Sequence, residues 1–316
     1  MSEQSTETAA SARSPTVLAD LAMLVTVTIW AINNVMVKTV IDTISPIVYV
    51  FFRFLFVCVL IFAWMAIRGG VPRIAREDWG RLLFTGIVGF AIYNSLFTVA
   101  LKYTTAFSGA ILFSLAPVVT MALAAALRIE RARRVQWVGV AISSLGVAIY
   151  VGEKLRGNAP ALGDGLSLLG VFAFASYTLA ARPLGVRYGS LTVTAWSCAI
   201  GLAALTPFAV LPLRQQDWGV VGLDVWGVVL YSSALSMLVG YTLWGWAIQR
   251  AGVGRTAPYL YLSPVIAGIA SLLVLDERFT LLKLVGAALV LAGVVVARSA
   301  AAWEWRARRA AAMREA

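Results

Sequence analysis

The chain has 316 residues, of which 60% are hydrophobic and only 13% are charged, and its formal net charge is +11. It contains no histidine and two cysteines. The lack of histidine argues against zinc and serine-hydrolase chemistry, and two cysteines cannot build a disulfide framework. We therefore expect no enzyme of these kinds, no metal and no cofactor. The composition is instead typical of a protein embedded in a lipid bilayer.

Apolar segments follow one another along nearly the whole chain. Residues 1–16 are polar and lack the basic opening of a secretory signal, so they predict a disordered tail. Apolar runs, most of them about the length that crosses a bilayer core, then lie near residues 17–39, 46–67, 79–101, 105–127, 135–152, 163–183, 190–213, 226–249, 255–275 and 281–298. Residues 299–316 predict a basic tail, either an interfacial helix or a frayed helical extension.

Runs of this length predict helices, because only helices and closed barrels satisfy every backbone group in lipid and barrel strands are much shorter. The predicted fold class is an all-α integral membrane protein with ten transmembrane helices. The lipid bilayer is therefore an expected partner.

The second half of the chain repeats the first. Residues 105–149 laid over 252–296, a shift of 147 positions without a gap, match at 11 of 45 columns, where composition alone gives about four. Residues 17–152 and 163–298 are thus predicted to be two five-helix repeats. Because five is odd, the second repeat enters the membrane from the opposite side, and such inverted repeats typically enclose a central cavity in transporters. A duplication without transport remains the alternative.

The cations test this topology. With both termini in the cytoplasm, the cytoplasmic segments hold 18 Lys and Arg and the outer segments hold seven, which has the sign of the positive-inside rule. Topology therefore explains the net charge. No segment outside the membrane is large enough to fold as a nucleic-acid-binding domain, so no nucleic-acid partner is expected.

Polar and aromatic side chains recur at helical spacing inside several predicted spans. Applying the shift places residues of the second repeat under residues of the first, which predicts two half-sites facing one cavity. The candidate substrate-binding residues from this pattern are Trp30, Asn33, Asn34, Tyr93, Asn94, Phe97, Tyr177, Tyr241 and Trp244. For any single ring, simple helix packing is the competing interpretation.

Prolines sit near the middle of the fourth and ninth spans at equivalent positions. Pro117 and Pro264 each remove a backbone donor and loosen the helix, with Ser114 and Tyr261 one turn earlier. Interrupted helices in matching places of two halves indicate a transporter binding site and a gating point. A kink that serves packing alone is the alternative.

Arg53 is the only charge well inside a predicted span. An intramembrane cation is a functional candidate that could bind a substrate carboxylate, or its side chain could snorkel to the outer interface. No Asp or Glu occupies the centre of a span, which removes the usual proton relays.

The repeated residues resemble the EamA domain signature of the drug/metabolite transporter superfamily. They are Pro117, Glu130, Arg131, Gly139 and Gly146, and in the second copy Pro264, Glu277, Arg278, Gly286 and Gly293. The likeness covers residues 17–298 and looks closest to bacterial inner-membrane exporters of amino acids and metabolites, including the aromatic amino-acid exporter group. It implies that helices one, three, four, six, eight and nine line the cavity. The first helix lacks the Glu of the small multidrug relatives.

These observations give a functional hypothesis. We expect an inner-membrane exporter of amino acids or related small metabolites, broad in specificity, working by alternating access of the two repeats. A multidrug or amphiphile efflux pump coupled to protons is the first alternative. A membrane scaffold or sensor without transport is the second.

Overall fold

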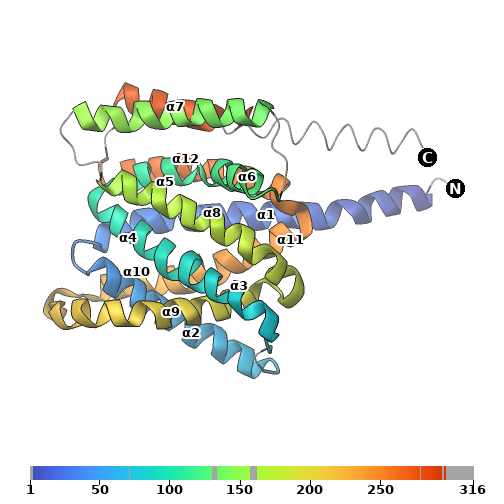
Figure 1. The fold of residues 1–316 in the computed structure, drawn as a ribbon, viewed down its shortest axis with the longest axis horizontal. Coiled ribbons are helices and arrows are strands. Elements are labelled where there is room, and N and C mark those ends of the chain that lie inside the picture. Colours follow the sequence, from blue (N-terminus) through green and yellow to red (C-terminus); the bar gives the residue numbers. More distant parts are fainter. Residues whose placement is uncertain are drawn as a thin grey trace.

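The computed structural model describes residues 3–70, 72–129, 134–156, 162–277, 279–293 and 295–296. It is a bundle of helices that run back and forth along one common direction (Figure 1). Among the described residues, seven helices are long and apolar enough to cross a membrane, and three shorter apolar helices, Trp137–Ile149, Tyr259–Val274 and Leu281–Gly293, accompany them. The predicted fold class, ten transmembrane helices in two inverted repeats, is confirmed. The predicted tail at 299–316 lies outside the described residues.

The first repeat contains five spans. Span one is α1 (Glu3–Val40) and span two is α2 (Pro46–Ile67), which begins at a proline, a residue preorganised for the first turn. Span three joins η1 (Arg76–Asp78), α3 (Trp79–Phe84), η2 (Thr85–Ile92) and α4 (Tyr93–Tyr103). Span four is α5 (Ala106–Phe113) followed by α6 (Ala116–Ala126), and span five is α7 (Arg134–Arg156).

The second repeat follows the same order. Spans six and seven are α8 (Leu162–Tyr188) and α9 (Ser190–Gln215), and the short η3 (Trp218–Val220) leads onward. Span eight joins α10 (Leu223–Tyr231), η4 (Ser232–Gly240) and α11 (Tyr241–Thr256). Span nine is η5 (Ala257–Tyr261) with α12 (Leu262–Val274), and span ten is the helix Leu281–Gly293.

The predicted tail at residues 1–16 overlaps the start of the first span. The helix α1 begins at Glu3, and the disordered tail stays a prediction.

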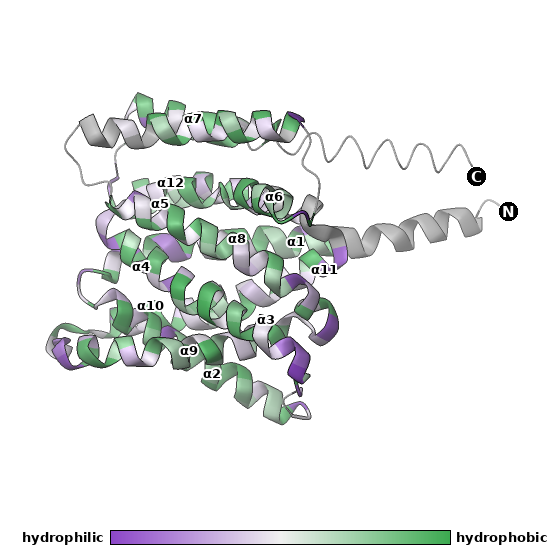
Figure 2. Cartoon of the chain, viewed as in Figure 1, coloured by the Kyte–Doolittle hydropathy of each residue, from purple (hydrophilic) through white to green (hydrophobic). Residues whose placement is uncertain are grey.

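Polar residues gather at the loops and helix ends, and apolar residues cover the flanks of the helices (Figure 2). Large apolar side chains such as Leu60, Phe208 and Leu273 are exposed on those flanks, where lipid tails accommodate them. We call the membrane face at which α1 enters near Val17 the N-terminal face, and the other one the far face.

The two repeats are interleaved. α1 packs on α11 and α12, α2 on α9 and η4, α4 on α8, and α5 on α12, so spans one to four pack chiefly against spans of the second repeat. The core therefore lies between the repeats.

Spans five and ten form a separate pair beside this bundle (Figure 1) and show the internal symmetry directly. A Cβ at Gly146 would lie 2.7 Å from the Gly286 carbonyl oxygen, and one at Gly293 would lie 2.6 Å from that of Gly139. The shift of 147 residues converts one contact into the other. The Ser143 hydroxyl donates to the Val290 carbonyl at 3.2 Å, and these two residues are themselves related by the shift.

The central sections of spans three and eight are π-helices. They are η2 and η4, which the shift superimposes from their first residues, Thr85 and Ser232. π-Helical turns are rare and are frequent at functional sites, because the wider turn leaves carbonyl groups available to other partners. Both π-helices adjoin the centre of the bundle.

Candidate substrate-binding site

A small cavity of about 30 Å³, here called the inner cavity, lies between the repeats. It is lined by Trp30, Asn33, Asn34, Arg53, Tyr93, Asn94, Phe97, Phe113, Ser236, Tyr241 and Ser263. Eight of these side chains are sequence-based candidates, namely all of them except Phe113, Ser236 and Ser263. The repeat register thus brings together residues that are up to 211 positions apart (241 − 30).

A larger cavity of about 180 Å³, here called the outer cavity, adjoins it toward the N-terminal face. Its lining comes entirely from α8, α9 and α11 of the second repeat. The candidates Tyr177 and Trp244 line this cavity, and Tyr241 lines both cavities. Arg182 and Gln249 add polar groups to its wall. Tyr241 is therefore a shared wall between a wider compartment and a narrower one.

Arg53 is buried, with 6% of its surface exposed. One terminal nitrogen donates to the Ser236 hydroxyl at 3.0 Å and the other to Asn94 Oδ1 at 3.4 Å, while Nε has no hydrogen-bond partner. Within the described ranges no carboxylate forms an ion pair with it, since the ion pairs found there belong to Arg187. The side chain is thus held inward and does not snorkel. A buried guanidinium with free hydrogen-bonding capacity is a strong receptor for a carboxylate.

The groups around Arg53 are neutral and fixed by their own hydrogen bonds. Asn94 Nδ2 donates to the Phe90 carbonyl at 3.1 Å. The Ser232 hydroxyl bonds Asn33 Oδ1 and the Tyr49 hydroxyl, which links α1, α2 and η4. Amides and hydroxyls in this arrangement can bind a polar or zwitterionic group without supplying a second charge.

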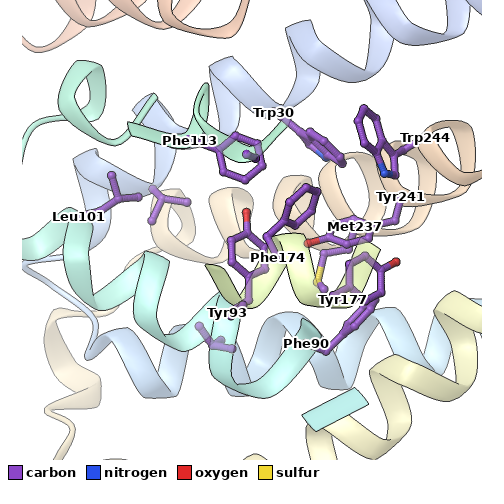
Figure 3. Close-up of a cluster of buried hydrophobic side chains, with 14 of the residues drawn as sticks. Trp30, Phe90, Tyr93, Leu101, Phe113, Phe174, Tyr177, Met237, Tyr241 and Trp244 are labelled. Atoms are coloured by element: carbon purple, nitrogen blue, oxygen red, sulfur yellow. The ribbon is translucent and has the colours of Figure 1, made fainter. Parts of the chain in front are cut away.

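Aromatic rings from both repeats gather in one buried cluster (Figure 3). Trp30 lies 5.4 Å from Tyr241 and 5.6 Å from Trp244, measured between ring centroids, and Tyr93 lies 5.1 Å from Phe174. The Trp30 indole also donates to the Ser236 carbonyl of the π-helix η4 at 2.9 Å. The related contact places the ring of Tyr177 against Gly89 of η2. In each repeat, one aromatic ring thus packs against the π-helix of the other repeat: Trp30 against η4, and Tyr177 against η2.

Two predicted residues lie elsewhere. Ser114 is fully buried at the break between α5 and α6, where its hydroxyl donates to the Ile111 carbonyl at 2.6 Å. Tyr261 is half-buried at the end of η5, and neither residue lines the inner or the outer cavity. Both residues lie at the junctions that precede α6 and α12, and their role in substrate binding stays a prediction.

The helix breaks themselves are at equivalent places. α6 begins at Ala116, one residue before Pro117, and α12 begins at Leu262, two residues before Pro264. The second break brings Ser263 into the inner cavity. The helix break in span nine therefore lies next to the inner cavity.

Sequence reasoning missed several polar residues of the site. Ser236 and Ser263 line the inner cavity, and Ser232 lies behind it, bonded to Asn33. The signal that could have found the serines was their clustering at positions 232, 233 and 236, deep within a predicted span. Serines also occur at ordinary helix–helix contacts in membranes, so their clustering alone does not identify a binding site.

The geometry defines a class of protein. An all-helical bundle of inverted repeats with interrupted spans and polar, ring-lined cavities between the repeats is the architecture of a secondary transporter. The described residues also contain no group of three His, Cys, Asp or Glu side chains placed to hold a metal ion.

Comparison with known proteins identifies the family. The profile of the EamA-like transporter family matches residues 17–152 and 161–299, and the chain therefore belongs to this family of multi-pass membrane transporters. Its signature residues Glu130, Arg131 and Arg278 lie outside the described residues.

Individual relatives are distant but extend over most of the chain. An uncharacterised transporter of Archaeoglobus fulgidus is 28% identical over 87% of this chain and 95% of its own length. A probable amino-acid metabolite efflux pump of Escherichia coli is 27% identical over 87% of this chain and 93% of its own length. A probable terminal-alkyne amino-acid exporter of Streptantibioticus cattleyicolor is 29% identical over 72% of this chain and 75% of its own length. One crystal structure matches with a TM-score of 0.62 at 18% identity, covering 90% of this chain and 96% of that one. This last likeness concerns the fold alone.

Proposed function

We propose that this protein exports amino acids or related small zwitterionic or amphipathic metabolites across the bacterial inner membrane. The two repeats rock around the central cavities and expose them alternately to the two faces. The excess of cations on the loops of the N-terminal face supports an orientation with both termini in the cytoplasm. The outer cavity is then a vestibule on the cytoplasmic side.

The observation that carries this proposal is the state of Arg53. A buried guanidinium that lacks a carboxylate partner and keeps one nitrogen unbonded has capacity for an anionic group of a ligand. Asn33, Asn34 and Asn94 can bind the amino group and other polar parts, and the rings provide flat apolar surfaces that tolerate many side chains. Broad recognition of amino acids follows from this combination.

The lining of the cavities disfavours the proton-coupled multidrug alternative. Neither cavity has an Asp, Glu or His in its wall. A pump that exchanges organic cations for protons needs a titratable acid in the binding site. Similarity to proteins named as probable amino-acid exporters also favours the proposed class of substrate.

Counterflow in proteoliposomes tests the proposal. Purified protein is reconstituted with unlabelled amino acid inside, and uptake of labelled Met, Thr, Phe and Trp is followed. We expect flux for at least one of them, competition among several, and no dependence on an imposed proton gradient.

The matched variants are Arg53→Gln and Arg214→Gln. Arg53→Gln removes the charge and keeps a polar side chain, and loss of charge-assisted hydrogen bonds worth about 1.5–3 kcal/mol weakens apparent affinity roughly 10- to 150-fold. Arg214 is an exposed cation at the far face, so its replacement leaves flux unchanged. Absence of flux for every amino acid would reject the substrate class.

A further inference from the structure

The internal symmetry is broken at the outer cavity. Two of the residues that line it are Gly185 on α8 and Ile248 on α11. The shift of 147 residues relates them to Lys38 on α1 and Leu101 on α4. If both repeats had the same conformation, a matching cavity would open between α1, α2 and α4 at the far face, because the repeats are inverted.

That matching cavity is closed. The Lys38 ammonium donates to the Leu101 carbonyl oxygen at 2.7 Å, and only 1% of the Leu101 surface is exposed. The corresponding place in the second repeat has a glycine and remains open. The lysine therefore ties together the two helices that would have to separate.

Contacts between the repeats also close the far face. Glu277 accepts hydrogen bonds from the Ala106 amide at 2.8 Å, and the rings of Phe107 and Phe279 lie 4.4 Å apart. Gln216 accepts from the Ser45 amide at 2.9 Å. The structure is therefore open toward the N-terminal face and closed toward the far face.

We propose that Asn34, Lys38, Asn94, Phe97 and Leu101 line a second vestibule that opens at the far face when the repeats exchange conformations, and that Lys38 is its anion-binding group. Opening breaks the bond to the Leu101 carbonyl and frees the ammonium. Lys38 lies four residues beyond Asn34 on the same helix, one turn further toward the far face, so it can receive a carboxylate that leaves Arg53. The role of Lys38 in carboxylate release rests on the proposed function. The vestibule, and its closure by the hydrogen bond from Lys38 to the Leu101 carbonyl, do not rest on it.

Site-directed labelling tests the vestibule. Single cysteines replace Leu101 or Ile248 in a background with Cys58→Ser and Cys198→Ser, and a membrane-impermeant maleimide is added to either side of oriented vesicles. We expect Ile248→Cys to react from the N-terminal face and Leu101→Cys to be protected. Lys38→Met should raise labelling of Leu101→Cys from the far face about tenfold or more, since a charged hydrogen bond that holds the closed state is lost. Arg214→Met, which removes an exposed cation at the far face outside both cavities, is the control and should change nothing.

The lysine's role in release is tested by flux. Lys38→Met should reduce export of phenylalanine at least fivefold more than export of phenylalaninamide, which has no carboxylate. Equal labelling of both cysteines, or no effect of Lys38→Met, would overturn the vestibule, and equal loss for both substrates would overturn the anion site. If no amino acid is transported but the labelling pattern holds, the substrate class fails and the vestibule stands.

Discussion

The burial of Arg53 leads to a specific prediction: removing its charge should stabilise the fold and at the same time abolish amino-acid flux. Taking an ion out of water costs several kcal/mol, and Arg53 recovers part of this through bonds to Ser236 and Asn94, of which the second is long at 3.4 Å. Arg53→Met keeps a flexible apolar stem of similar length. Each lost hydrogen bond costs about 1 kcal/mol net. Replacing a buried ion by a well-packed apolar group often stabilises a protein by about 1–4 kcal/mol. We therefore expect the variant to be more stable than the unchanged protein.

Thermal unfolding in detergent, followed by intrinsic tryptophan fluorescence, measures the effect. At about 2 °C per kcal/mol for a chain of this size, Arg53→Met should raise the Tm by roughly 2 to 8 °C. The same variant should lose amino-acid flux. Arg214→Met, an exposed cation, is the control and should shift the Tm by less than about 1 °C. A fall in Tm for Arg53→Met would refute the reasoning, because it would show that the guanidinium supports the fold rather than awaiting a ligand.

Three further variants probe the contacts that position the site. Gly293→Ala forces a methyl group to within 2.6 Å of the Gly139 carbonyl and should lower stability by about 1–3 kcal/mol in the same unfolding assay, whereas Gly152→Ala, with open space around it, should not. Trp30→Phe removes the indole donor to Ser236 and leaves a carbonyl of η4 unpaired, so we expect the free energy of unfolding to fall by about 1–3 kcal/mol and flux to fall with it. Glu277→Gln replaces the carboxylate that accepts the Ala106 amide at the start of α5 with a neutral amide, which weakens this cap. Labelling of Leu101→Cys from the far face should then rise a few-fold. An unchanged labelling rate would contradict the view that the cap helps to close that face.

The sequence by itself determined the number and direction of the spans. Ten apolar runs and a constant shift of 147 residues suffice for two inverted five-helix units, because lipid leaves a backbone few alternatives and an odd count forces inversion. The same register predicted that residues such as Trp30, Asn94 and Tyr241 lie together, and all three line the inner cavity.

Only the tertiary structure decided how that shared space is divided. Sequence symmetry treats the two repeats as equal, but one packed conformation places Tyr241 between an inner and an outer cavity and closes the first repeat with Lys38. The π-helices and the breaks before Pro117 and Pro264 change the local rotation per residue, so counting by 3.6 does not fix which neighbouring side chains face the two cavities. Whether Arg53 snorkels or turns inward depends on partners supplied by η4 and α4, from distant parts of the chain, and helix periodicity carries no information about such contacts.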